Sequence, residues 1–134
     1  MAMTVERKIQ KAKIALMGSK EFGMWGGVIM VGKTIVDDVT PTACTNGRDE
    51  WYGRGFMKSL GDKETAYIVM HENHHKGLRH LSTWQNLWKK DQLLANQACD
   101  YVSNLMIKKA DPKENICRMP TDNAGNPIGL FDWA

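Results

Sequence analysis

The chain has 134 residues, of which 43% are hydrophobic and 25% are charged, and its formal net charge is +3. This length and composition fit one globular domain with its own core and exclude a wholly disordered chain. The small positive charge argues against a nucleic-acid partner, and no apolar run approaches the ~18 residues of a membrane-spanning helix.

The cysteines and the N-terminus predict where the protein resides. Cys44, Cys99 and Cys117 are an odd number without C-x-x-C spacing, so they indicate reduced thiols rather than a disulfide framework or a cysteine zinc finger. The N-terminus lacks the apolar core of a signal peptide. We therefore expect a cytoplasmic protein without membrane association.

The first predicted element is an amphipathic helix. Thr4 is a residue type that caps helices, and Gly18 is placed to end one. Between them, four apolar residues recur at helical spacing, namely Val5, Ile9, Ala12 and Leu16. This pattern is typical of a helix that packs one face on a core.

Residues 24–53 carry strand and turn signals. Met24 to Val39 is rich in Val and Ile and predicts one or two strands joined by a turn at Gly32. Asn46-Gly47 then provides the dipeptide typical of a tight hairpin turn, with short extended segments on either side. We expect a small, largely antiparallel sheet within residues 27–53.

Two further helices follow. A short helical segment is expected at residues 56–60, and Asp62 is predicted to cap a helix that is apolar nearly all round from Ala66 to Met70, as in a helix buried against a sheet. A later helix runs from Asp91 to about Lys109. The domain is therefore expected to span residues 1–134, with a core at 1–110 and an irregular proline-containing tail at 111–134.

The later helix has two stripes of opposite character. Its apolar stripe comprises Leu94, Ala98, Tyr101, Val102 and Leu105, and its polar stripe comprises Asn96, Asp100 and Asn104. A polar stripe is normally the solvated side of a helix. Here the middle of that stripe is a candidate to face a functional site instead.

All four histidines of the chain fall within residues 71–80. His71-Glu72-Asn73-His74-His75 matches H-E-x-x-H, in which two imidazoles four residues apart project from one helix face toward a single metal ion. A bound Zn²⁺ is therefore expected, with Glu72 as the general base that accepts a proton from water. His74 points about 100° away from its neighbours and is expected to be exposed or hydrogen-bonded rather than ligating.

A catalytic zinc usually takes three protein ligands, and two candidates remain for the third. His80 lies nine positions after His71 and would reach the ion only if Gly77 ended the helix, as a glycine does in metzincins. Asp100 would supply a carboxylate from a second helix, the arrangement that gluzincin-like enzymes use. We favour Asp100, with His80 as the alternative.

Other polar residues near the motif have plainer interpretations. Lys76, Arg79, Lys89 and Lys90 are expected to form a solvated basic rim. The hydroxyls of Tyr67 and Tyr101 are candidates for stabilising an oxyanion, although core packing explains both residues equally simply.

Three segments, in order and with compatible spacing, carry a family resemblance: Thr42 to Arg48, His71-Glu72-x-x-His75 with His80, and Asn96-x-x-x-Asp100-Tyr101-x-x-Asn104. Over residues 5–110 the chain resembles the metallopeptidase domain found ahead of von Willebrand A-like domains in bacteria and as stand-alone versions in phages. The resemblance implies an α+β, zincin-like fold in which a small antiparallel sheet packs against the H-E-x-x-H helix and a second helix. The chain departs from the family at Asn46, where aspartate is usual, and at Gly77, where alanine is common.

The sequence leaves three functional hypotheses. The first is a zinc-dependent hydrolase, most simply a metallopeptidase acting on a protein or peptide in a bacterial or phage-infected cell. The second is a non-catalytic module in which zinc is fully coordinated and structural. The third is a nucleic-acid-associated zincin-like protein, which the small net charge disfavours.

Overall fold

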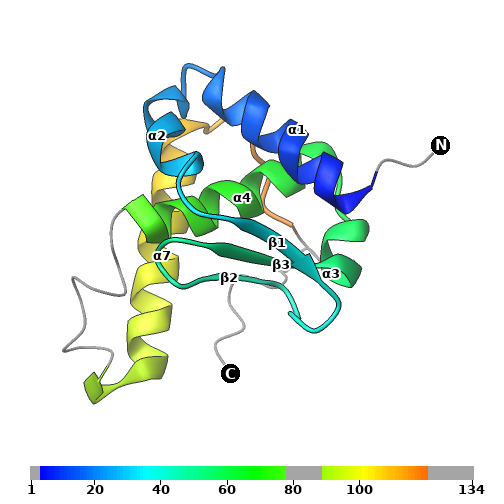
Figure 1. Ribbon diagram of the computed structural model, residues 1–134. Helices are drawn as coiled ribbons and strands as arrows, with labels where there is room; N and C mark the ends of the chain where they lie inside the picture. The colour runs from blue at the N-terminus through cyan, green and yellow to red at the C-terminus, as the bar shows by residue number, and fades with distance from the viewer. Residues whose placement is uncertain (1–3, 78–88, 121–134) are drawn as a thin grey trace.

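The computed structural model describes residues 4–77 and 89–120. It shows an α+β fold in which one buried helix, α4 (Asp62–Gly77), lies between the other helices and a three-stranded sheet (Figure 1). Helix α1 (Val5–Met17) packs along α4, and α7 (Gln92–Ala110) crosses near the end of α4 that carries the histidines. The expected fold class is confirmed.

The sheet is mixed rather than largely antiparallel. Its strands are β1 (Thr34–Asp37), β2 (Ala43–Thr45) and β3 (Glu50–Gly53), in the order β1-β3-β2. The predicted hairpin pairs β2 with β3 in antiparallel fashion, but β3 then lies parallel to β1. β3 lies between its two predecessors, and no local pattern in the sequence indicates this order or the parallel pairing.

Both predicted turns are present. Gly47 in the hairpin has a φ of 97°, and the side-chain oxygen of Asn46 accepts hydrogen bonds from the backbone N–H groups of Arg48 and Asp49. Gly32 has a φ of 80°, and a Cβ atom there would lie 1.8 Å from the carbonyl oxygen of Arg48. Only glycine fits the second position, because both the backbone angle and the close approach of a neighbouring chain exclude a side chain.

The prediction of a strand that begins near Met24 is wrong. Residues Gly23–Trp25 form a 3₁₀ turn, η1, and Gly26–Ile29 form a short helix, α2. Ile29 is buried in the core, whereas Met24 is 86% exposed. A short apolar run fits a single helical turn as well as a strand, and here the helical turn is the one that inserts Ile29.

The helix ends follow local chemistry. Thr4 accepts a hydrogen bond from the backbone of Arg7 and caps α1, and Asp91 caps α7 in the same way. The cap of α4 is Gly61 rather than Asp62, because the Gly61 carbonyl accepts the N–H of Thr65. The side chain of Glu64 bonds back to the Gly61 N–H, which completes a capping box without a capping hydroxyl.

The core lies between α1, α4 and the sheet, and the short α3 (Arg54–Lys58) closes one end of it. The stretch after α7 contributes to the same core, since Cys117 is buried against it. In the described residues, no helix is long and apolar enough to cross a membrane.

The buried face of α7 is mixed in character. It combines Ser103 and Asn104 with the apolar Ala95, Cys99 and Ile107, while Tyr101 of the apolar stripe is 65% exposed. The stripe that hydrophobicity marks as the packing face therefore lies outside, and part of the polar stripe is buried instead. The side chain of Asn96 lies outside the described part of the structure.

Candidate metal centre

Helix α4 is buried over nearly its whole length, including its polar part. Every residue from Thr65 to His74 is buried. Buried imidazoles and carboxylates must find partners, because an unpaired polar group in the interior is costly. The buried face of α7 supplies several of these partners.

Three ligand-type atoms from α4 and α7 converge on one point. The Nε2 atoms of His71 and His75 lie 3.1 Å apart, and Oδ1 of Asp100 lies 3.0 Å from the first and 2.9 Å from the second. The two imidazole rings meet edge to face, with their centroids 4.6 Å apart. Asp100, one of the two candidates for the third ligand, is thus in contact with both imidazoles. His80 lies outside the described residues.

The far side of the His71 ring is also fixed. Its Nδ1 atom lies 3.0 Å from Oδ1 of Asn104, which also accepts a hydrogen bond of 2.9 Å from the hydroxyl of Tyr67. An amide oxygen can only accept, so the Nδ1–H of His71 donates to it. Nε2 is then the ring nitrogen that faces His75 and Asp100 and can bind a metal ion there.

The same amide has one unsatisfied atom. Nδ2 of Asn104 is buried and has no hydrogen-bond partner in the described part of the chain. An unmade buried hydrogen bond costs about 1–3 kcal/mol. In this orientation, the amide oxygen of Asn104 is hydrogen-bonded to His71 and Tyr67, while the amide nitrogen is left without a partner among the described residues.

The protonation equilibria of the cluster are coupled. Burial alone would lower the pKa of His71, but hydrogen bonding to Asp100 and the nearby carboxylates outweigh it and raise that pKa above its ordinary value. Burial would raise the pKa of Asp100, yet the two imidazoles lower it on balance. Without a metal, a proton must separate these atoms, and a metal ion that binds there must displace it.

Glu72 lies beside the converging atoms. It is 5% exposed, and one of its oxygens and ring nitrogens of His71 and His75 all lie within 4.8 Å of one another. Burial raises the pKa of Glu72 and outweighs the opposing effect of the two imidazoles. Two carboxylates thus adjoin the histidine pair. Asp100 contacts both rings at 3.0 Å or less.

Two neighbouring residues on α4 were predicted from their positions beside the motif. His74 is not a member of the converging group, and of its two predicted environments it has the hydrogen-bonded one: it is buried, with Nδ1 3.3 Å from the hydroxyl of Ser103 and its ring edge-on to Trp25. Lys76 was expected on a solvated rim but is only 5% exposed. Its burial depends on a compensating anion that lies far away in the sequence.

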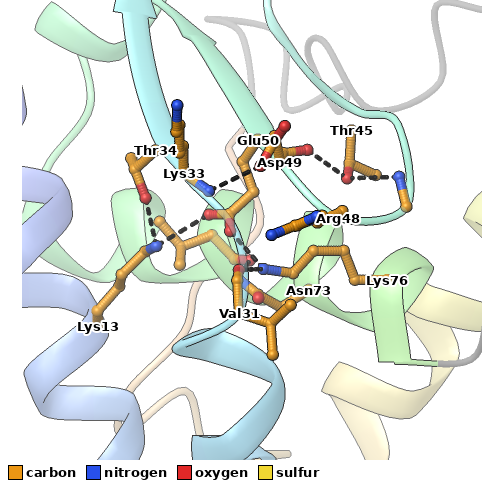
Figure 2. Close-up of polar contacts among 12 residues, drawn as sticks. Lys13, Val31, Lys33, Thr34, Thr45, Arg48, Asp49, Glu50, Asn73 and Lys76 are labelled. Atoms are coloured by element: carbon orange, nitrogen blue, oxygen red, sulfur yellow. Dashed lines mark hydrogen bonds and ion pairs between the residues drawn. The ribbon is translucent and has the colours of Figure 1, made fainter.

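That anion is Glu50, at the start of β3 (Figure 2). Its fully buried carboxylate lies 2.5 Å from the ammonium of Lys76 and 3.1 Å from that of Lys13, and it accepts a hydrogen bond from the hydroxyl of Tyr52. The ammonium of Lys76 also donates to the carbonyl of Val31. This charge cluster of Lys13, Glu50, Lys76 and Tyr52 ties the C-terminal part of α4 to the sheet and α1.

The tyrosines show why a hydroxyl near a site is weak evidence for catalysis. Tyr67 has its hydroxyl occupied by Asn104, as core packing with a satisfied hydroxyl predicts. Tyr101 is exposed on the opposite side of α7 from the residues that face α4. The residue that the sequence left without a role is Asn104, although its position four residues after Asp100 indicates that both lie on one face.

The donor set fits a zinc ion. Two neutral imidazole nitrogens and one carboxylate oxygen are ligands that zinc takes in catalytic sites, and ligands bound at ~2.0–2.1 Å in a tetrahedron lie about 3.3 Å apart. The observed separations of 2.9–3.1 Å are close to this spacing. The two histidines come from one rigid buried helix, so they are held together before a metal arrives.

The sequence profile of the family described as "Putative metallopeptidase domain" matches residues 4–118. No curated protein and no solved structure matches the chain.

Proposed function

The chain belongs to this metallopeptidase-domain family, and from that membership and the converging side chains we propose that the protein is a zinc-dependent peptidase. The observation that carries the proposal is the approach of His71, His75 and Asp100 to within 3.1 Å of one another, with Glu72 beside them. Family membership alone indicates a protein or peptide substrate.

In this proposal His71, His75 and Asp100 hold the metal. A bound Zn²⁺ would supply Lewis-acid polarisation of a substrate carbonyl and would make nearby water more acidic. Three protein ligands leave a coordination position open, which is what distinguishes a catalytic zinc site from a structural one.

Glu72 acts as the general base. Its carboxylate accepts a proton from the water molecule whose oxygen attacks the scissile carbonyl, and it then delivers that proton to the amide nitrogen as the C–N bond breaks. Its buried position beside the two imidazoles supports this role, since proton transfer requires a fixed carboxylate at the reacting centre. Asn104 positions the His71 ring, with Tyr67 on the same amide oxygen.

Glu72→Gln separates a catalytic from a structural zinc site. The variant retains the shape of the side chain and removes the base, so we expect one zinc per chain, as in the wild type, but a rate of peptide hydrolysis lower by about 10²–10⁴-fold. Metal content is measured by elemental analysis and hydrolysis with a quenched fluorescent peptide library. If hydrolysis is absent from the zinc-loaded wild type, or unchanged in Glu72→Gln, the peptidase proposal fails.

Histidine variants test which imidazoles hold the metal. His71→Ala is expected to lose zinc, because it removes one of the three proposed ligands. His74→Gln is the matched control: it removes a neighbouring buried imidazole that lies outside the group, and it should retain zinc. Equal zinc loss in both variants would argue against the proposed ligands.

A further inference from the structure

One face of α7 is apolar and exposed, with no element from the described residues 4–77 and 89–120 packed over it. Leu94, Tyr101, Val102 and Leu105 are 51%, 65%, 42% and 41% exposed, and Ala98 between them is also exposed. This face lies opposite the residues that contact α4 and the candidate metal centre. It is a contiguous stripe on one helix, which marks a site of association more often than scattered apolar residues do.

The spacing of the stripe is that of a helix-pairing seam. Leu94, Ala98, Tyr101 and Leu105 follow one another at intervals of four, three and four residues, the alternation of the a and d positions of a heptad repeat. Asp91 and Lys108 extend the same alternation by one position at each end, and both are exposed. Such a seam fits another helix better than it fits a flat surface or a small molecule.

The stripe is complementary to itself in the antiparallel direction. The sequence midpoint of the stripe lies between Cys99 and Asp100. Leu94 and Leu105 are equally far from this midpoint, and so are Ala98 and Tyr101. An antiparallel partner therefore places leucine on leucine and the smallest residue opposite the largest, as close packing of facing positions requires. At the ends of the seam, the same symmetry places the carboxylate of Asp91 opposite the ammonium of Lys108, so the charges are complementary as well.

We propose that two copies of this chain associate through an isologous, antiparallel pairing of their α7 helices, with a two-fold axis beside Cys99 and Asp100. In such a pair each residue contact occurs twice, which is the defining property of a two-fold interface. The interface leaves the opposite face of α7, with Asp100, turned toward its own α4. The pairing is independent of the metal and of the proposed peptidase activity.

Sedimentation of the zinc-loaded protein over a range of concentrations tests the proposal. The mass should rise from 15.2 kDa toward twice that value with concentration. A seam of this length buries less than the standard interface of about 1,600 Å², so the dimer is expected mainly at high concentration. Leu105→Glu should remain a monomer, while Ile14→Glu, which alters a residue 64% exposed on α1, should dimerise like the wild type.

Cross-linking tests the direction and register of the pairing. The exposed Cys44 is first changed to serine; Cys99 and Cys117 are buried. A mixture of Ala98→Cys and Tyr101→Cys chains should cross-link with a short bismaleimide more efficiently than either variant alone. Equal cross-linking by each variant alone, or a monomeric wild type up to ~1 mM, would overturn the proposal; in the monomeric case the face would have to serve a different protein.

Discussion

Helix α4 takes part in two buried polar clusters that differ in how their charges are balanced. The charge cluster places the carboxylate of Glu50 between the ammonium groups of Lys13 and Lys76. The converging group of His71, His75 and Asp100 brings three electron-pair donors together, with no lysine or arginine among its described contacts. In the charge cluster the carboxylate is balanced by the two lysines. The converging group requires protons or a cation between its members.

This difference separates the roles of the two clusters. A compensated buried ion pair fixes the packing of the elements that carry it, and removing one partner leaves an uncompensated charge. A group of electron-pair donors gains further stability when a cation binds between its members. Substitutions at Glu50, Asn104 and Asp111 therefore test how each buried group contributes to folding or to metal binding.

Glu50→Gln should strongly destabilise the fold with or without metal. The substitution removes the anion between two lysines, and breaking a buried ion pair typically costs about 3–5 kcal/mol of unfolding free energy. Urea unfolding of the metal-free and zinc-loaded protein gives the measurement. Asp62→Asn, which disrupts only the exposed pair with Lys11, is the control and should change stability little.

The contrast would fail if Glu50→Gln were as stable as the wild type. It would also fail if that substitution abolished zinc binding in protein that remains folded, because the charge cluster would then belong to the metal site.

Asn104→Ala should weaken zinc binding by about 10–100-fold, the usual effect of removing a partner that orients a ligating imidazole. The substitution releases the Nδ1–H of His71 while leaving all three proposed ligands in place. Competition with a chromophoric chelator measures the affinity. Tyr67→Phe removes only the second hydrogen bond to the same amide oxygen and should have a smaller effect; unchanged affinity in Asn104→Ala would remove this residue from the site.

Asp111 tests a third kind of buried charge, one balanced by backbone N–H groups. Burial would raise its pKa, but hydrogen bonds from the backbone of Cys117, Ile116 and Asn115 lower it on balance. Because the folded-state pKa lies below the unfolded value of about 3.9, the ionised carboxylate stabilises the fold above that pH and less as the pH falls through the folded-state pKa.

Asp111→Asn should therefore cost about 1–2 kcal/mol near neutral pH, the range for a lost hydrogen-bonded cap. The difference from the wild type should shrink below pH ~4. Urea unfolding across this pH range provides the measurement. A difference that stays constant with pH would show that the charge of Asp111 contributes nothing.

The sequence predicted the parts of the structure that depend on local chemistry. The cap at Thr4, the hairpin turn at Asn46-Gly47 and the paired histidines follow from rules that act within a few residues. The choice between strand and helix at Gly26–Ile29 does not follow from such rules, because four residues are too few to distinguish the helical repeat from the alternation of a strand.

The environments of Lys76 and Tyr101 depend on long-range contacts. Lys76 is buried because Glu50 reaches it from a strand distant in the sequence, which no pattern near the lysine records. Tyr101 is exposed because the polar residues of α7 are needed against the buried histidines of α4. Hydrophobicity alone assigned the wrong side of α7 to the interior, whereas the spacing of Asp100 and Asn104 indicated the right one.

Titration of the metal-free protein with Zn²⁺, with Asp100→Asn beside the wild type, tests whether His71, His75 and Asp100 together bind a metal ion. The substitution preserves the shape of the side chain and removes its charge. We expect the wild type to bind one equivalent and to unfold at a higher temperature when zinc is present, and Asp100→Asn to lose both the tight binding and the thermal shift. Equal zinc affinity in the two proteins would exclude Asp100 as a ligand.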